Sequence, residues 1–482
     1  MNSAANLMLW LALVAPLPLG LLAWLKPPRH MRTVALAAGT LPLATWWLLP
    51  QAVEGGLNGR LALGGLSLHW RLDALTALLL LLTQLVLLAS AAYAVGHRRV
   101  AVPDEASHAR FWPLLGGLAF ALGLIWVAAD LLLLYVGLEL MGLCAVGMML
   151  LPGKVEAIRA GLRYLLYALV GSLAWLLGVA LLLGAWGTLE LAELAAVAEP
   201  DVTTRIGMAL LTGGLLLKAA IFPLHGWLVP VHASAWTPVS AVHGALVVKA
   251  SFFILILLWR LLLPDAVTAA WVLGMLGASA VLWGGLKAWR ADSLKQVVAW
   301  STVGQLGYLM LLFPLLAGTA ASVAAMAWQA TWLQLAGHAL VKAAMFMAVG
   351  NLMLSTGASR LVDLAGTSRR LPLSLMTFGI AAVTLMGLPP SAGFTAKWLL
   401  LQASLEAGQW PWVAVLALGT LLTAAYVFRV LRCSFVEEAS HHEFHPPPRG
   451  ADLVPLVLAM AAVGLGLVAE WPLAMLRQGG VP

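Results

Sequence analysis

The chain has 482 residues, of which 62% are hydrophobic and only 10% are charged. A soluble domain carries about 25% charged residues, so this composition excludes a water-soluble globular protein. The formal net charge of +7 does not indicate nucleic-acid binding, because the basic residues stand in small groups between apolar spans.

Two cysteines, Cys144 and Cys433, lie far apart, and the sequence has no CxxC or CxxCH motif. This spacing gives little support to a disulfide scaffold, an iron–sulfur cluster or covalently attached haem. We therefore expect no redox chemistry and no cofactor in this chain, so any coupled electron transfer must take place elsewhere.

Apolar spans of about 20 residues predict a polytopic membrane protein that is all-α, with about fourteen transmembrane helices. The first span lacks a basic flank and a cleavage site, so it is interpreted as a retained helix rather than a signal peptide. In chain order, the predicted helices begin near Leu7, Thr33, Ala74, Phe111, Asp130, Ala157, Arg205, Pro238, Thr268, Ser293, Ala321, Pro372, Trp410 and Asp452.

The basic residues predict the orientation of these helices. Connections after odd-numbered spans hold eighteen lysines and arginines, Lys295 among them, whereas the opposite connections hold five. The positive-inside rule then places both termini on the non-cytoplasmic side. Four basic residues fit neither group because they lie deep within spans: Lys218, Lys249, Lys342 and Lys397.

Buried charge is the most informative feature of the sequence. An ionised side chain at the bilayer centre costs about 2.5–3.5 kcal/mol on insertion scales, so Glu139 and the four lysines are functional candidates. The alternative is a lysine that reaches the membrane surface with its long stem. Lys249 and Lys342 are too deep for this, whereas the depth of Lys218 and Lys397 depends on nearby helix breaks.

Prolines and glycines beside two of these lysines predict that the seventh and twelfth helices are discontinuous. Lys218 precedes Pro223 by about one turn, and Lys397 follows a segment that contains Pro389, Pro390 and Gly393. Proline removes a backbone donor, and irregular backbone at membrane depth needs cover from protein or water. Simple proline kinks are the alternative, but paired broken helices are typical of transporters built from inverted repeats.

Histidines lie near the same lysines. His225, His232 and His243 flank the second half of the broken seventh helix, and His338 precedes Lys342 by four residues, on the same helix face. Imidazole groups relay protons near neutral pH, although packing is the alternative role, more so for His243 than for His338.

No metal site is expected, because acidic residues at ligand spacing are missing around these histidines. The run His441-His442-Glu443-Phe444-His445 could bind a metal, but a solvated loop is the preferred interpretation.

Seven strings, taken together, resemble the antiporter-like proton-translocating membrane subunits of respiratory complex I, membrane-bound hydrogenases and Mrp-type cation/proton antiporters. The strings are Val136-Gly-Leu-Glu139-Leu, Lys218-Ala-Ala-Ile-Phe-Pro-Leu-His-Gly-Trp227, Thr237-Pro-Val-Ser-Ala-Val-His-Gly244, Val248-Lys249-Ala, Asp292-Ser-Leu-Lys-Gln-Val, Ser301-Thr-Val-Gly-Gln-Leu-Gly-Tyr308 and His338-Ala-Leu-Val-Lys342-Ala-Ala-Met-Phe. The resemblance spans most of the chain, from about Leu115 to Phe435.

The resemblance implies two inverted five-helix repeats. Residues 1–110 would form helices 1–3, 111–263 the first repeat (helices 4–8), 264–435 the second repeat (helices 9–13), and 436–482 a cytoplasmic loop and helix 14. Glu139 and Lys218 would form a mobile ion pair, Lys249 would connect two half-channels, Lys342 with His338 would act as a central relay, and Lys397 as the terminal proton-exchange residue.

The resemblance also implies a bacterial inner-membrane location and partner membrane subunits, some of them homologous to this chain. Desolvation disfavours a charged lysine and a nearby carboxylate favours it, so separating Glu139 from Lys218 would release a proton toward Lys249. A stand-alone secondary solute transporter and an intramembrane enzyme are weaker hypotheses. A related membrane subunit that energises inorganic-carbon uptake is also compatible with the motifs.

Overall fold

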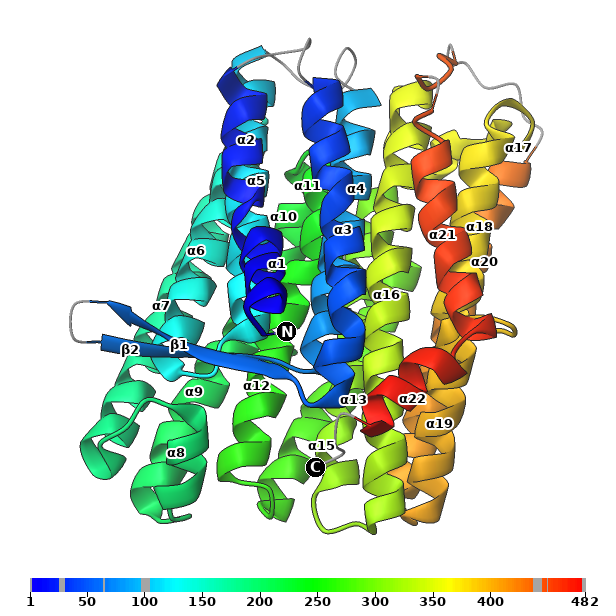
Figure 1. Ribbon diagram of the computed structural model, residues 1–482. Helices are drawn as coiled ribbons and strands as arrows, with labels where there is room; N and C mark the ends of the chain where they lie inside the picture. The colour runs from blue at the N-terminus through cyan, green and yellow to red at the C-terminus, as the bar shows by residue number, and fades with distance from the viewer. Residues whose placement is uncertain are drawn as a thin grey trace.

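The fold is a bundle of long, roughly parallel and antiparallel helices, crossed on the outside by one β-hairpin (Figure 1). It was obtained as a computed structural model, and it describes residues 2–25, 31–63, 66–96, 105–436, 444–448 and 450–478. The residues 441–443 of the histidine run lie outside these ranges.

The first half of the chain forms helices α1–α12, one hairpin and one short π-helix. The elements are α1 (Asn2–Val14), α2 (Pro16–Leu25), α3 (Met31–Glu54), β1 (Leu57–Leu63), β2 (Leu66–Leu72), α4 (Ala74–Gly96), α5 (Glu105–Val127), α6 (Leu131–Leu150), α7 (Val155–Trp186), α8 (Leu191–Val197), α9 (Val202–Lys218), α10 (Leu228–Ser234), α11 (Thr237–Val242), the π-helix η1 (His243–Val247) and α12 (Val248–Leu262).

In the described residues of the second half, all the named elements are helices. Its elements are α13 (Val267–Arg290), α14 (Leu294–Met310), α15 (Leu312–Leu316), α16 (Ala321–Thr356), the 3-10 helix η2 (Leu361–Leu364), α17 (Thr367–Arg370), α18 (Pro372–Met386), α19 (Ala392–Glu406), α20 (Trp410–Phe435), α21 (Leu453–Leu467) and α22 (Glu470–Gln478). The 36-residue helix α16 packs against α4, α11, α14, α18, α19 and α21, so it joins the two halves.

Within the described residues, eleven helices are long and apolar enough to cross a membrane, or twelve if the bent pair α21–α22 is one span. The chain is therefore a polytopic membrane protein. Two of the fourteen predicted spans are not among these helices, because each consists of two shorter helices: α9 with α10, and α18 with α19. These are the two helices expected to be discontinuous.

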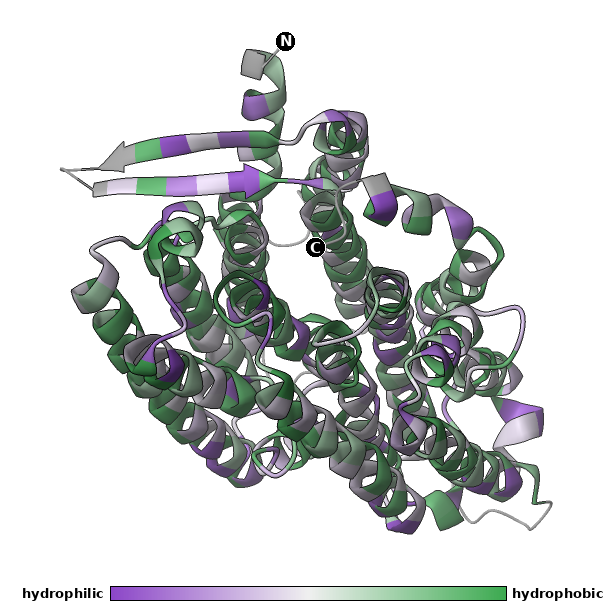
Figure 2. Cartoon of the chain, turned by 90° about the horizontal axis from the view of Figure 1, so that it is seen from below, coloured by the Kyte–Doolittle hydropathy of each residue, from purple (hydrophilic) through white to green (hydrophobic). Residues whose placement is uncertain are grey.

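The hairpin of β1 and β2 was not predicted from the sequence. β1 and β2 pair antiparallel, from Leu57 opposite Leu72 to Leu63 opposite Leu66, and the hairpin projects sideways from the bundle (Figures 1 and 2). His69 on β2 lies 3.7 Å from the carboxylate of Glu190, which attaches the hairpin to the loop before α8. Figure 2 shows hydrophilic residues along the hairpin and mostly hydrophobic residues on the surrounding helices.

Close packing of small residues joins α7 to α9. A Cβ atom added to Gly171 would lie 2.8 Å from the carbonyl oxygen of Gly214, and one added to Gly178 would lie 2.8 Å from that of Gly207. Small residues allow helix backbones to approach closely in membranes, where lipid gives no hydrophobic drive for helix association. This contact holds the C-terminal end of α9, and thus Lys218, against α7.

Candidate functional site

An ion pair lies where α9 ends. The Lys218 ammonium donates to Oε1 of Glu139 over 3.0 Å, and Ser172 of α7 donates to the same oxygen over 2.5 Å. The Lys218 side chain is only 5% exposed, whereas that of Glu139 is 29% exposed at the surface of the chain. Three different helices, α6, α7 and α9, therefore converge on one carboxylate.

The chain breaks directly after Lys218. Residues 219–227 are not helical, Pro223 lies among them, and α10 begins at Leu228. Ala220 is held at a φ of 54°, a left-handed conformation that is strained for a residue with a side chain. The indole of Trp227 donates to the carbonyl oxygen of Leu217 over 2.9 Å, so a side chain replaces part of the interrupted helical hydrogen bonding.

Lys249 is buried beside the π-helix η1. Its ammonium donates to the carbonyl oxygen of Gly244 over 2.8 Å, and the residue is 1% exposed. A π-turn widens the helix and is frequent at functional sites. Here it brings a backbone carbonyl to a lysine that has no carboxylate partner within the described part of the chain.

Lys342 lies at the centre of α16 and is completely buried. Its ammonium donates to the carbonyl oxygen of Val298 over 2.9 Å and to the hydroxyl of Ser301, both on α14. His338 is one turn away on α16, and neither of its ring nitrogens hydrogen-bonds to the described residues. This histidine lies within electrostatic range of three of the predicted site lysines: Lys249, Lys342 and Lys397.

The side chain of Lys397, on α19, reaches across the second break. Pro389 and Pro390 lie between α18 and α19, and Lys397 donates to the carbonyl oxygens of Leu385 (3.0 Å) and Met386 (3.2 Å) at the end of α18. Its ammonium also lies 4.7 Å from the ring centre of Tyr308. The carbonyls at a helix C-terminus carry partial negative charge, which favours a cation there.

Gly393, predicted as part of this break, is instead the second residue of α19. A Cβ atom on it would collide with the carbonyl of Thr384 in α18. Its role in the structure is therefore close packing between the two half-helices, and the chain interruption ends before it.

A buried glutamine connects the surroundings of Lys342 to those of Lys397. Gln305 follows Ser301 by one turn of α14, accepts from the amide of Gln334 over 2.8 Å, and donates to the carbonyl oxygen of Leu385 over 3.4 Å. Lys397 donates to that same carbonyl. Polar groups thus continue from one lysine to the other across α14, α16 and α18.

The three histidines near the first break occupy different environments. His243 is buried with its ring nitrogens against the carbonyl oxygens of Val239 (2.8 Å) and Ala145 (3.2 Å), which fits a packing role. His232 is buried, stacks on Phe346, and its Nδ1 makes no hydrogen bond to the described residues. His225 is half-buried and packs against Phe222 and Trp300, away from the hydrogen bonds of the four lysines.

The sequence of this chain matches a family model over residues 128–423, and the description of that family is "NADH:quinone oxidoreductase/Mrp antiporter, TM". The chain belongs to this family. All the predicted site residues, from Glu139 to Lys397, lie within the matched region.

Known relatives extend the match over most of the chain. The NADH-quinone oxidoreductase subunit N of Desulforudis audaxviator is 33% identical over 85% of this chain and 84% of its own length. A subunit of the Na(+)/H(+) antiporter of Bacillus subtilis is 26% identical over 92% of this chain and 89% of its own. A chain of the Mrp complex from Dietzia sp. DQ12-45-1b is 26% identical, with a TM-score of 0.86, covering 98% and 97% of the two chains.

Three residues at this site were not predicted from the sequence. Ser172 and Gln305 are neutral, so no charge marked them within their apolar spans. Lys295 was counted among the basic residues of the connections, a count that carries no information on burial; the structure shows it only 7% exposed, with its ammonium 2.6 Å from the carbonyl oxygen of Ala235. Its position at the second residue of α14 gave no sign of burial, which comes from the neighbouring α10.

Proposed function

We propose that this chain is a proton-translocating subunit of a larger membrane complex, of the Mrp, hydrogenase or complex I type. The observation that carries the proposal is the ion pair between Glu139 and the buried Lys218 at the break after α9. A charged lysine deep in a membrane protein marks an ion pathway by default, because its burial is expensive.

The ion pair provides a switch for one proton. While Glu139 lies beside Lys218, the carboxylate favours the charged form of the lysine. When Glu139 moves away, desolvation is no longer offset, and Lys218 releases its proton toward Lys249. Such a switch requires a partner that interacts differently with the two states. The partial exposure of Glu139 at the chain surface gives a neighbouring subunit access to it.

Beyond Lys249, the proposed path runs through His338 and Lys342 to Lys397. His338 lies within electrostatic range of all three lysines, and Gln305 shares the Leu385 carbonyl with Lys397. His232 is an additional relay for the proton, and His225 and His243 are weaker candidates for this role. The helix breaks at Pro223 and at Pro389-Pro390 provide irregular backbone along the path.

We further propose fourteen membrane crossings, counting α9 with α10 and α18 with α19 as one broken span each. Residues 111–263 and 264–435 are then inverted repeats, framed by 1–110 and 436–482. Two lysine-bearing breaks five spans apart support this division. In this arrangement both termini lie on the non-cytoplasmic side of a bacterial inner membrane.

Partner subunits follow from the same comparison. The Dietzia chain belongs to a Mrp complex and the Desulforudis relative is one subunit of an oxidoreductase. We infer that this chain likewise assembles with other membrane subunits, some of them homologous to it, and that any redox reaction resides in those partners.

Transport measurements test the proposal. Glu139→Gln and Lys218→Met are each expected to reduce proton translocation in membrane vesicles to background, while the partner subunits still co-purify. Glu406→Gln, at the exposed end of α19, and Lys287→Met, beside Trp283, are matched controls that should transport normally. Full transport by either site variant would refute the assignment.

A further inference from the structure

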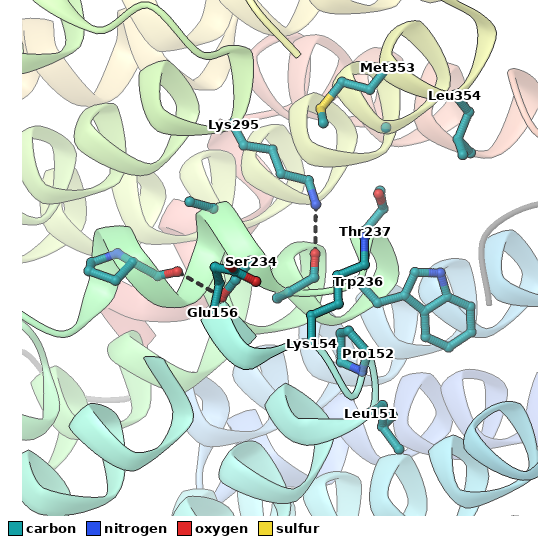
Figure 3. Close-up of a pocket in the computed structure, with 14 residues that line it drawn as sticks. Leu151, Pro152, Lys154, Glu156, Ser234, Trp236, Thr237, Lys295, Met353 and Leu354 are labelled. Carbon is teal, nitrogen blue, oxygen red and sulfur yellow. Dashed lines mark hydrogen bonds between the residues drawn. The ribbon is translucent and has the colours of Figure 1, made fainter. Parts of the chain in front are cut away.

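A cavity of about 800 Å³ opens at the end of the bundle where α6 meets α7. Its walls come from the α6–α7 turn, α10, the start of α14 and the last turns of α16, and the charged side chains in its lining are Lys154, Glu156 and Lys295 (Figure 3). One water occupies about 30 Å³ in the liquid, so this cavity has room for many waters and carries polar groups to hold them.

Lys295 lies at the inner wall of this cavity. Figure 3 shows its side chain extending across the cavity to the turn between α10 and α11, where the ammonium donates to the carbonyl oxygen of Ala235 over 2.6 Å. Within the described residues no carboxylate pairs with it, and the charged neighbour within electrostatic range is Lys154. Two ammonium groups and a single carboxylate therefore set the charge of the lining.

His232 lies behind the wall of the cavity, on the side of the protein interior. It belongs to α10, whose Pro230, Ala233 and Ser234 line the cavity, but its own side chain is buried at 1% exposure. It lies within electrostatic range of Lys295 and of Lys249. Its Cε1 is 3.6 Å from the position of a Cβ on Gly244, and Gly244 supplies the carbonyl that accepts from Lys249.

We propose that this cavity is a water-filled vestibule and that Lys295 makes it selective for protons over metal cations. The inference rests on the proposed function, because it names the ion that reaches the buried lysines from this side. A proton can be handed on by the Lys295 side chain, whereas a metal cation must itself move past the positive charge of that side chain. This difference is the source of the selectivity.

A sodium or potassium ion in the vestibule meets the positive charge of Lys295 and Lys154 and has one carboxylate, Glu156, to replace its hydration shell. Metal cations of this kind need several oxygen ligands. A proton is carried differently. The Lys295 ammonium passes its proton inward through vestibule water, the unpartnered Nδ1 of His232 accepts it to form an imidazolium, and the resulting amine is protonated again from the bulk solution.

Thiol labelling tests the vestibule without measuring transport. Ala233 is an exposed wall residue, so Ala233→Cys in the assembled complex is treated with a cationic and an anionic methanethiosulfonate of similar size. The two labelling rates are each divided by the rate at which the same reagent reacts with a simple thiol. After this correction, we expect the anionic reagent to label roughly five- to tenfold faster than the cationic one. Adding Lys295→Gln should remove most of this preference, whereas adding Lys287→Gln, outside the vestibule, should not. The protein without the new cysteine reports labelling of Cys144 and Cys433.

Transport of the same variants completes the test. Arginine keeps the positive charge but does not give up its proton, so Lys295→Arg should lower proton translocation at least about tenfold while sodium remains excluded. Lys295→Gln should also slow proton translocation, because the glutamine amide neither holds nor passes on a proton at this position. Full proton transport by Lys295→Arg, equal labelling by both reagents, or no labelling at all would overturn the inference.

The two proposals fail separately. Normal transport by Glu139→Gln or Lys218→Met removes the proposed function, whatever the labelling shows. Loss of transport in those variants, combined with labelling that is insensitive to charge, removes only the role of Lys295.

Discussion

Lys218 and Ser172 share one carboxylate oxygen, the Oε1 atom of Glu139, at 3.0 Å and 2.5 Å. The lysine reaches it from the last residue of α9 and the serine from the middle of α7. The position of the carboxylate is therefore determined by two donors on two helices, and only one of the donors is charged.

Replacing Ser172 should weaken this site without removing its charges. A hydrogen bond to a charged group contributes about 1.5–3 kcal/mol, so Ser172→Ala should lower proton translocation roughly tenfold because the carboxylate is held less well beside Lys218. Ser434→Ala is a matched control, since Ser434 is also buried and also donates to the carbonyl four residues before it. Equal rates for the two variants would show that Ser172 has only an intrahelical role.

The Glu139–Lys218 pair should also be visible in stability. Each single variant, Glu139→Gln or Lys218→Met, leaves one charge without its partner, whereas the double variant removes both. Contacting residues typically show coupling of about 0.5–3 kcal/mol, so the double variant should lose less free energy of unfolding than the sum of the two single variants. Thermal unfolding of the purified complex, followed by tryptophan fluorescence, measures this. Additive losses would argue against a direct pair.

Helix packing between α7 and α9 should be intolerant of one added methyl group. A Cβ on Gly214 would lie 2.5 Å from the carbonyl oxygen of Gly171, while one on the adjacent Gly213 would meet nothing within 4 Å. Gly214→Ala should therefore destabilise the protein by about 1–3 kcal/mol, and Gly213→Ala should be neutral or stabilising by up to about 1 kcal/mol. The comparison needs only the melting temperatures of the two variants; a harmless Gly214→Ala would contradict the close approach.

Gln305 should matter for the second half of the path. Gln305→Leu removes both the hydrogen bond from Gln334 and the donor to the Leu385 carbonyl, so we expect proton translocation to fall about tenfold, a barrier increase of about 1.4 kcal/mol. Gln402→Leu, on α19 beyond Lys397, provides the control. If Gln305→Leu transports at the normal rate, the polar connection between Lys342 and Lys397 runs elsewhere.

The sequence was sufficient to predict the helical membrane bundle and both helix breaks, because hydrophobic length, proline and buried charge act locally. Lys249 and Lys342 could be recognised as buried because their stems are too short to reach the interface. The environment of these lysines could not be predicted. Three of them, Lys249, Lys342 and Lys397, bind backbone carbonyls of other turns or helices, and such carbonyls leave no mark in the sequence.

The hairpin and the burial of Lys295 were missed for different reasons. The stretch from Leu57 to Leu72 carries Gly64-Gly65 between two short runs, which is a recognised hairpin signal, but only apolar helical spans were sought in the sequence. Lys295, by contrast, is buried by contact with the turn that follows α10, some sixty residues away in the chain. That contact depends on tertiary packing and could not be inferred from local pattern.

The uninterrupted length of α16 has a mechanical consequence. At 1.5 Å per residue, its 36 residues form a rod about 54 Å long, well beyond the ~30 Å of the hydrocarbon core. A continuous helix of this kind does not fold at its centre, so His338 and Lys342 keep a fixed spacing. A rearrangement during a working cycle is then expected in the non-helical segments at residues 219–227 and 387–391.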